Sequence, residues 1–228
     1  MAGAAGAAKD RAFEYVKSQV LTGALSGGEL ISEGEIASAL GMSRTPVREA
    51  FLRLEAQGLL RLYPKRGALV VPVSPEEIRA VMEVRLVFEQ FAAQKVLHSG
   101  PEARQAAYRR LSEEITRQEH AGSAGDLQEF LESDRIFHSV TIQDAHNSIL
   151  WGFYASLRDR QMRMTGESAI REPHRIATIL DEHRGIAEAI GAGDVEQAHR
   201  AVKIHHASTL RALGIAVDAT SPWAPSGW

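Results

Sequence analysis

The pattern of apolar residues changes once along this chain, near residue 73. Before that point, two short segments with helical spacing, residues 32–40 and 43–57, precede two β-prone runs at 59–63 and 68–73. After it, every periodic segment has the spacing of a helix. Six helices are expected there, over residues 75–98, 101–120, 124–143, 147–166, 173–190 and 194–213. The sequence therefore predicts a mainly α protein, with a small mixed N-terminal domain and an all-α bundle of six helices.

The expected domains follow from this change of pattern. Residues 10–73 are predicted to form the N-terminal domain, and residues 74–215 the helical domain. The Ala/Gly-rich start, residues 1–9, and the tail, residues 216–228, lack periodicity. Both ends are therefore expected to be flexible.

The composition argues against two classes of protein. The longest apolar runs fall far short of the ~20 residues that a membrane-spanning helix needs. The chain also contains no cysteine, which excludes disulfides and cysteine-ligated metals. A cytoplasmic protein with no membrane partner is expected, because the absence of cysteine fits a reducing compartment.

The first domain carries the signals of two short helices and a hairpin. Ser32 and Glu35 form a capping box that opens the first helix, and Gly41 closes it. The second helix begins after Ser43, and a turn at residues 64–67 joins the two β-prone runs. Two short helices with a tight turn, followed by a hairpin, predict a winged helix-turn-helix whose second helix enters the DNA major groove.

Positive charge is concentrated on this expected DNA-reading part. Residues 43–66 hold six basic side chains against two acidic ones, although the whole chain has a net charge of −3. Two of the arginines lie four residues apart on one helix face, where the arginine fork can bind guanine or phosphate. The predicted DNA-binding residues are Ser43, Arg44, Thr45, Arg48 and Arg53 on the helix, and Lys65, Arg66 and Gly67 at the wing tip. For Arg53, a structural role fits as well as a DNA contact.

These residues resemble the GntR family of bacterial repressors. The resemblance covers residues 10–73 and rests above all on the segment Ser-Arg-Thr-Pro-Val-Arg-Glu at 43–49. It implies a homodimer that binds a palindromic operator in double-stranded DNA. Gly34 departs from the pattern, because some members have an arginine there that touches DNA. That contact is expected to be missing here.

Four side chains of the helical domain have the spacing of a metal site. Asp134 and His138 lie one turn apart on the same helix face. His183 and His205 are each eleven residues from Asp194, at the turn of an expected helical hairpin. Their imidazoles are therefore expected side by side, and they can meet the Asp134 and His138 pair inside the bundle.

Three imidazoles and one carboxylate suit Zn²⁺, Ni²⁺, Mn²⁺ or Fe²⁺, with a position left for a ligand. A polar core network without a metal explains the same spacing, and spacing alone leaves both open. His206 fits the hairpin symmetry less well than its neighbour His205. Arg85, on the first helix of this domain, either binds the carboxylate of an effector or pairs with Glu89 at i,i+4.

The helical domain resembles the FCD sensor domain found in the FadR branch of the same family. The resemblance spans about residues 76–213. It rests on the segments Glu83–Glu89 and Asp134–His138, on Glu182 with His183, and on His205. It implies that the four spaced residues are metal ligands, and the expected six helices favour the VanR-like version. Acyl-CoA-binding members lack these ligands, so a fatty-acyl effector is not expected.

Together these features predict a DNA-binding transcription regulator, and a repressor in particular. A small ligand, expected to be a carboxylic acid bound at the metal site, would control its operator affinity. A regulator that responds to the metal itself is one alternative. A metal-dependent hydrolase is another, since an open metal site can activate water. That alternative leaves the winged helix unexplained, so the chain is not expected to be an enzyme.

Overall fold

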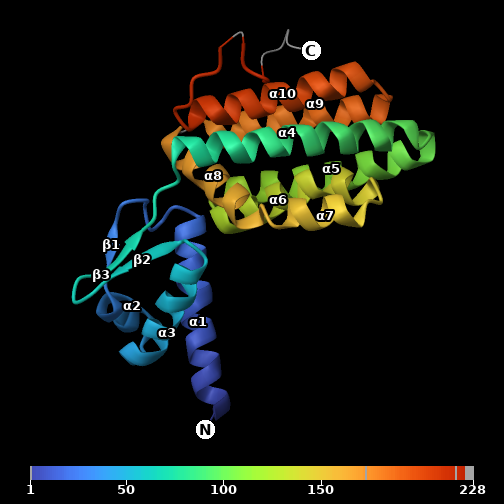
Figure 1. The fold of residues 1–228 in the computed structure, drawn as a ribbon. Coiled ribbons are helices and arrows are strands. Elements are labelled where there is room, and N and C mark those ends of the chain that lie inside the picture. The colour runs from blue at the N-terminus through green and yellow to red at the C-terminus, as the bar shows by residue number, and fades with distance from the viewer. Residues whose placement is uncertain (1, 173, 219, 224–228) are drawn as a thin grey trace. The chain divides into compact units, whose positions relative to one another are not determined.

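A computed structural model describes residues 2–172, 174–218 and 220–223 of the chain. It divides into two compact units, Met1–Val73 and Ser74–Trp228 (Figure 1). The division falls where the sequence pattern changes from short mixed segments to helices.

The smaller unit consists, in its described residues, of three helices and a three-stranded antiparallel sheet. Its elements are α1 (Ala2–Leu21), β1 (Leu30–Ile31), α2 (Glu33–Leu40), α3 (Arg44–Ala56), β2 (Leu60–Tyr63) and β3 (Gly67–Val70). The central strand is β3, with Leu69 opposite Leu30 of β1 and Val70 opposite Leu60 of β2. The β1 strand extends the predicted hairpin, and its two residues are too few to show a period.

The α1 helix includes residues that the sequence predicts to be flexible. Residues 1–9 are expected to be flexible, but α1 starts at Ala2. Five of these nine residues are alanine, the best helix former, so the run can extend the helix that continues through Asp10. Further along, Phe13 and Val16 are buried in one core with Phe51 and Leu54 of α3.

Both ends of α2 have the caps that the sequence predicts. Ser32 Oγ accepts a hydrogen bond from the backbone N–H of Glu35, and Glu35 Oε2 accepts one from the backbone N–H of Ser32. Gly41 ends α2 with a φ of 60°, which glycine adopts without strain. Ser43 occupies the N-cap position of α3, but its side chain makes no capping hydrogen bond.

The larger unit is all-α, and its described residues form seven helices instead of the predicted six. They are α4 (Pro75–His98), α5 (Pro101–Ala124), α6 (Leu127–Asp144), α7 (Ser148–Ala155), α8 (Arg158–Arg171), α9 (Arg175–Ala192) and α10 (Val195–Ala212). The single helix expected at 147–166 is broken at Ser156 and Leu157. No glycine or proline marks that break. The predicted helix number is wrong, and it no longer supports the VanR-like version.

Five of these helices enclose a polar interior. The α5 helix packs along α6 and α9, and α10 packs against α9 and α4 (Figure 1). Buried charged or histidine side chains on the enclosing helices include Arg85, Glu89, Asp134, His138, His183, His205 and His206. Because buried polar groups require partners, this interior is the place to look for a site.

Part of the C-terminal tail is packed. Trp223 is only 4% exposed, and the Asp218 carboxylate accepts hydrogen bonds from the backbone and hydroxyl of Thr220. The sequence predicts a flexible tail over residues 216–228, whereas these described residues make packing and hydrogen-bond contacts. Residues 219 and 224–228 of that tail lie outside the described residues.

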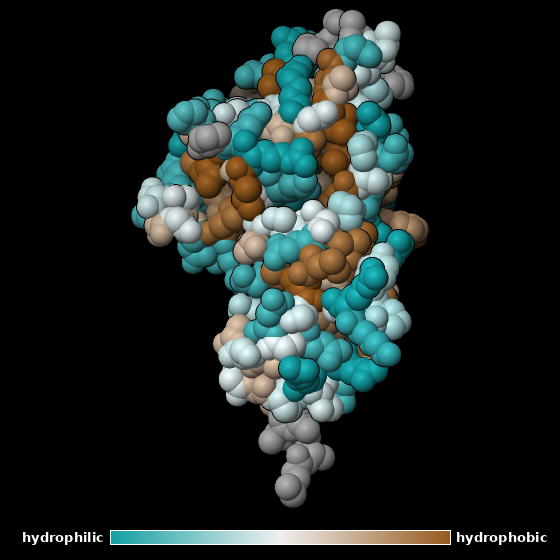
Figure 2. All heavy atoms as spheres, turned by 90° about the vertical axis from the view of Figure 1, so that its left-hand side faces the viewer, coloured by the Kyte–Doolittle hydropathy of each residue, from teal (hydrophilic) through white to brown (hydrophobic). Residues whose placement is uncertain are grey.

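The surface mixes hydrophilic side chains with hydrophobic patches, as the face drawn in Figure 2 shows. Exposed large apolar side chains include Val87 and Phe91 on α4 and Ile149 and Phe153 on α7. Contiguous exposed apolar side chains can mark a protein contact. Within the described residues, no helix is both long and apolar enough to cross a membrane.

Candidate metal centre and DNA-binding surface

The start of α3 presents its polar side chains to solvent. Ser43, Arg44, Thr45 and Arg48 are all exposed. The Arg48 side chain is 73% exposed, and its Nε lies 4.0 Å from Glu33 Oε1 of α2. The helix N-terminus adds backbone N–H groups and the positive end of the helix dipole. This end of α3 can therefore contact phosphates and base edges.

Gly34 of α2 leaves space that Arg44 occupies. A Cβ atom at position 34 would lie 3.3 Å from Arg44 Nη2. The guanidinium group of Arg44 thus lies where a side chain at position 34 would begin. The positive charge that position 34 lacks is supplied there by α3.

Arg53 lies against α1. Its Nη1 donates to Asp10 Oδ1 at 2.6 Å. Its guanidinium carbon is 4.0 Å from the centre of the Phe13 ring, which is within the range of a cation–π interaction. Of its two predicted roles, these contacts favour the structural one, in which Arg53 holds α3 to α1.

The wing tip carries Lys65 and Arg66 in the turn between β2 and β3. Both side chains are exposed, and Lys65 has a φ of 63°. Gly67 is required by packing, because a Cβ atom on it would lie 2.3 Å from the carbonyl oxygen of Ile31. Its φ of 102° also favours glycine. Any DNA contact of Gly67 is therefore additional to its role between β1 and β3.

Three histidines from three helices meet inside the larger unit. They are His138 of α6, His183 of α9 and His205 of α10, and one nitrogen atom of each lies within 4.8 Å of the other two. The ring centres are 4.8 to 5.0 Å apart. All three side chains are buried.

Asp134, the fourth predicted ligand, lies beside this group. Its Oδ1 is 3.8 Å from His183 Nε2, and its Oδ2 accepts a hydrogen bond of 3.2 Å from Thr165 Oγ1. Burial raises the pKa of Asp134. A cation next to the imidazoles would favour the charged form of this carboxyl.

Each of the three imidazoles has an oxygen atom at its Nδ1. These contacts are His138 with Glu89 Oε2 at 3.2 Å, His183 with Gln118 Oε1 at 2.8 Å, and His205 with Glu182 Oε2 at 2.9 Å. The Nε2 atoms of His138 and His183 have no hydrogen-bond partner among the described residues. Buried nitrogen atoms without a partner are rare, and these are the atoms that would bind a metal.

Burial keeps two of these rings neutral. It lowers the pKa of His183 and of His205 well below the usual value, and the nearby histidines add to the effect. Metals bind the neutral form of imidazole. The interior therefore presents unprotonated nitrogen atoms at neutral pH.

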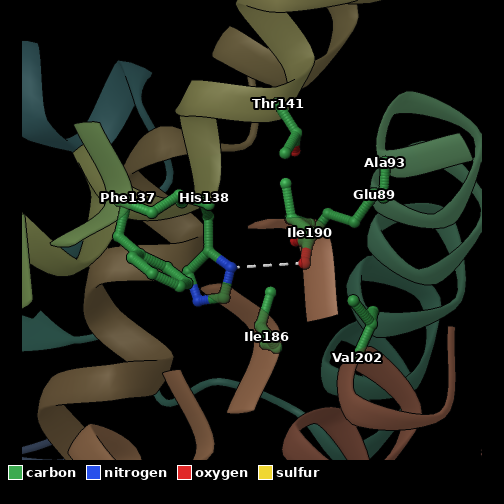
Figure 3. Close-up of a pocket in the computed structure, with 9 residues that line it drawn as sticks. Glu89, Ala93, Phe137, His138, Thr141, Ile186, Ile190 and Val202 are labelled. Atoms are coloured by element: carbon green, nitrogen blue, oxygen red, sulfur yellow. Dashed lines mark ion pairs between the residues drawn. The ribbon is translucent and has the colours of Figure 1, made fainter. Parts of the chain in front are cut away.

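The Glu89 carboxylate receives four hydrogen-bond donors. Oε1 accepts from Arg85 Nε at 2.8 Å and from the Tyr154 hydroxyl at 2.7 Å, and Oε2 lies 3.2 Å from His138 Nδ1 and 3.1 Å from His206 Nε2. Figure 3 shows Glu89 and His138 facing each other among mainly apolar side chains. Burial alone would raise the pKa of Glu89, but Arg85 and the two histidines hold it well below its usual value.

Arg85 makes the Glu89 pairing that the sequence left open, and it retains a further donor. Its Nη2 has no hydrogen-bond partner among the described residues. Burial by itself would lower the pKa of Arg85. The nearby negative charge of Glu89 has the larger effect, so the pKa of Arg85 is raised. Arg85 is therefore a buried cation with a nitrogen available to an effector.

His206 faces Glu89, and its ring centre is 5.8 Å from that of His205.

Two residues of this network had no sequence signal. Gln118 lies 65 residues from its partner His183. Arg175 is buried and places its Nη1 3.4 Å from Glu182 Oε2. In contrast, the i,i+4 spacing of Arg85 and Glu89 pointed to their pairing.

The donor set fits a divalent transition-metal ion. Neutral imidazoles with a neighbouring carboxylate suit such ions. A polar network without a metal would provide donors to the Nε2 atoms of His138 and His183, and the described residues provide none. Of the two interpretations that spacing alone left open, this orphaned pair favours a metal site.

Two protein families match the chain. Residues 8–70 match the family described as bacterial regulatory proteins, gntR family, and residues 80–208 match the FCD domain. An HTH-type transcriptional regulator in an unstable DNA locus of Streptomyces ambofaciens is 30% identical over 83% of this chain and 78% of its own length. The probable D-xylose utilization operon transcriptional repressor of Paenarthrobacter nicotinovorans is 27% identical over 87% of this chain and 85% of its own.

A solved structure shares the fold. The crystal structure of a putative transcriptional regulator GntR from Rhodococcus sp. RHA1 has a TM-score of 0.70 and 22% identity. The match covers 92% of this chain and 99% of the other.

Proposed function

Since the chain belongs to the GntR family of bacterial regulatory proteins and carries an FCD domain, we propose that it is a repressor controlled by a small carboxylic acid at a metal site. Like its relatives, it is a transcription regulator, and it is not an enzyme. The observation that carries the proposed control is the group of three buried imidazoles, two of which, His138 and His183, have an unpartnered Nε2 atom among the described residues. A regulator of this kind meets its DNA in the cytoplasm.

The DNA-binding half of the proposal rests on the exposed end of α3 and on the wing. Ser43, Arg44, Thr45 and Arg48 would contact DNA in the major groove, and Lys65 and Arg66 would contact it through the wing. We propose a homodimer on a palindromic operator, because two copies present two such helices to two half-sites. The relative described as a repressor supports the direction of control.

The Arg48→Ala variant tests this half. We expect it to weaken binding to the operator by roughly 1–3 kcal/mol and binding to random DNA by less, because base contacts carry specificity. Fluorescence anisotropy at several salt concentrations measures both. Equal losses on the two DNAs would make Arg48 a phosphate contact only.

In the metal-binding half, His138, His183 and His205 would hold the ion, with Asp134 as the fourth ligand. Such an ion would provide an open position that attracts a carboxylate. Zn²⁺, Ni²⁺, Mn²⁺ and Fe²⁺ all suit this donor set.

The charges around the imidazoles support an anionic effector. Three carboxyls, Glu89, Asp134 and Glu182, lie near two buried guanidinium groups, Arg85 and Arg175. With the carboxyls ionised, these groups sum to one negative charge, and a divalent ion changes the sum to one positive charge. An effector with a single carboxylate would balance it, and the unpartnered Nη2 of Arg85 could donate to it.

His183→Ala tests the metal site, with the exposed His120 as the matched control. We expect His183→Ala to lose the metal and the effector response and to keep basal operator binding, because the DNA-binding residues lie in the other unit. His120→Ala should keep all three. Elemental analysis of both variants decides the point, since full metal occupancy in His183→Ala would show that the site is wrong.

The effector class is tested with two probes on the metal-loaded protein. Acetate carries one negative charge and malonate carries two. We expect acetate to raise the melting temperature and weaken operator binding more than malonate does. Stronger stabilisation by malonate would contradict the charge argument. Release of DNA by metal alone would favour the alternative in which the metal is the signal.

A further inference from the structure

We propose that Glu89, Gln118 and Glu182 are positioning residues that set the affinity of the metal centre. This inference rests on the metal site proposed above. Each of the three residues holds the Nδ1 atom of one imidazole and turns the Nε2 atom of that ring toward the common centre. They come from α4, α5 and α9, and of these helices α4 and α5 carry none of the proposed ligands.

The contact between Glu89 and His138 determines which nitrogen of the His138 ring carries the proton. Three further donors, on Arg85, Tyr154 and His206, already point at the Glu89 carboxylate. A carboxylate with these partners acts only as an acceptor. His138 Nδ1 must therefore carry the hydrogen, which leaves the lone pair on Nε2. A hydrogen bond from a ligand imidazole to a carboxylate also increases the basicity of the nitrogen that binds the metal.

Glu182 and His205 repeat this arrangement on the other side of the centre. Glu182 Oε2 lies 2.9 Å from His205 Nδ1, and Arg175 Nη1 lies 3.4 Å from the same oxygen. Arg175 is itself held by Ser208 Oγ at 2.6 Å and by Thr209 Oγ1 at 2.7 Å. Each of these two imidazoles is thus backed by a carboxylate that a buried arginine anchors.

The third imidazole has a weaker partner. Gln118 Oε1 lies 2.8 Å from His183 Nδ1, but an amide oxygen carries no full charge. The Nε2 atom of Gln118 is buried and has no hydrogen-bond partner among the described residues. A carboxylate in place of this amide would be a stronger acceptor for His183 and would remove the unpartnered donor.

Two substitutions at these contacts are expected to change the metal affinity in opposite directions. Glu182→Gln should weaken metal binding by roughly 10–100-fold, the usual range for loss of an outer hydrogen-bond partner. Gln118→Glu should tighten metal binding by roughly 10-fold for the same reason. A merely structural role would not do this, because a packing defect weakens binding in both variants.

Gln161→Glu is the matched control for the second change. Gln161 is also a buried glutamine with an unpartnered Nε2, but it lies on α8 in a pocket lined by Tyr154 and Arg158. The control measures how much any added buried carboxylate changes the affinity through space. We expect it to have a smaller effect than Gln118→Glu.

The experiment uses the full chain stripped of metal and titrated with Zn²⁺ against a chromophoric chelator. Circular dichroism checks that each variant folds, and the absorption spectrum with Co²⁺ reports the geometry of the centre. If one variant fails to fold, the other decides. The inference is overturned if Glu182→Gln leaves the affinity unchanged, or if Gln118→Glu binds no tighter than Gln161→Glu. A wild-type chain that binds no Zn²⁺ would overturn the metal site as well, so the two failures are distinguishable.

Discussion

At the scale of single residues, the surroundings give the arginines of this protein different roles. Arg48 reaches into solvent with a side chain that is 73% exposed. Arg53 is fixed against α1, and Arg85 is buried beside Glu89. The same guanidinium group can therefore contact DNA, join two helices or balance a buried carboxylate.

The contacts of Arg53 give a prediction about stability. Arg53→Ala should lower the free energy of unfolding by roughly 1 kcal/mol, because it loses a partly exposed ion pair and a cation–π contact. Its preference for operator over random DNA should stay unchanged. Urea unfolding and anisotropy measure the two effects. A variant of unchanged stability that has lost operator preference would assign Arg53 to DNA recognition.

The buried histidines give a prediction about pH for the metal-free protein. Burial lowers the pKa of His183, His205 and His206, while in the unfolded chain histidine titrates near pH ~6.5. Below that pH the unfolded state takes up protons that the folded state does not. The stabilising contribution of these three histidines is thus complete above about pH 6.5. It is lost as the pH falls from there toward their pKa values in the folded state.

Urea unfolding with a chelator present, at pH 7.5, 6.5 and 5.5, measures this effect. The loss should approach about 1.4 kcal/mol per pH unit for each such histidine. His183→Gln should show a shallower dependence, because it has one such group fewer. Equal stability at pH 6.5 and 5.5 would show that these rings accept protons in the folded state.

At the scale of the elements, local sequence signals predict where a helix starts better than where it is interrupted. The capping box at Ser32 and Glu35 is present as predicted. The break between α7 and α8 falls at Ser156 and Leu157, two residues that are common inside helices. No glycine or proline falls at these two positions, so no local signal predicts the break.

An added methyl group is expected to have opposite effects on stability at two glycines. Gly67→Ala should destabilise the smaller unit strongly, because the Cβ atom would lie 2.3 Å from the Ile31 carbonyl oxygen. Gly185→Ala should stabilise α9 by roughly 0.5–1 kcal/mol, because nothing lies within 4 Å of its Cβ position and alanine is the better helix former. Thermal unfolding measures both, and a stable Gly67→Ala variant would contradict the close contact of β1 and β3.

At the scale of the whole molecule, one face of the larger unit has the features of a contact between two copies. Val84, Val87 and Phe91 of α4 are exposed, and so is Ile204 of α10, a helix that packs against α4. A groove of about 640 Å³ between these helices is lined by the acidic side chains of Glu83 and Glu196 and by the basic side chain of Arg200. In a two-fold contact, such a patch can pair its acidic residues with the basic residues of a second copy.

The variant Val87→Asp with Phe91→Asp tests this face. We expect it to shift the protein from dimer to monomer in analytical ultracentrifugation and to weaken binding to a palindromic operator, while a single half-site is bound as before. Phe153→Asp on α7, also an exposed aromatic position, is the control and should remain dimeric. Dissociation of the control alone would place the dimer contact on α7.

The sequence by itself determined the mainly helical class and the winged hairpin, and it predicted four residues that would bind a metal. These depend on local rules of capping, i,i+4 spacing and the symmetry of a helical hairpin, which read directly along the chain. Only the tertiary structure decided which oxygen holds each imidazole, since Gln118 is 65 residues from His183 and Glu89 is 117 residues from His206. Such contacts depend on how each helix is rotated against its neighbours. That rotation is fixed by packing of the whole core and by no single segment.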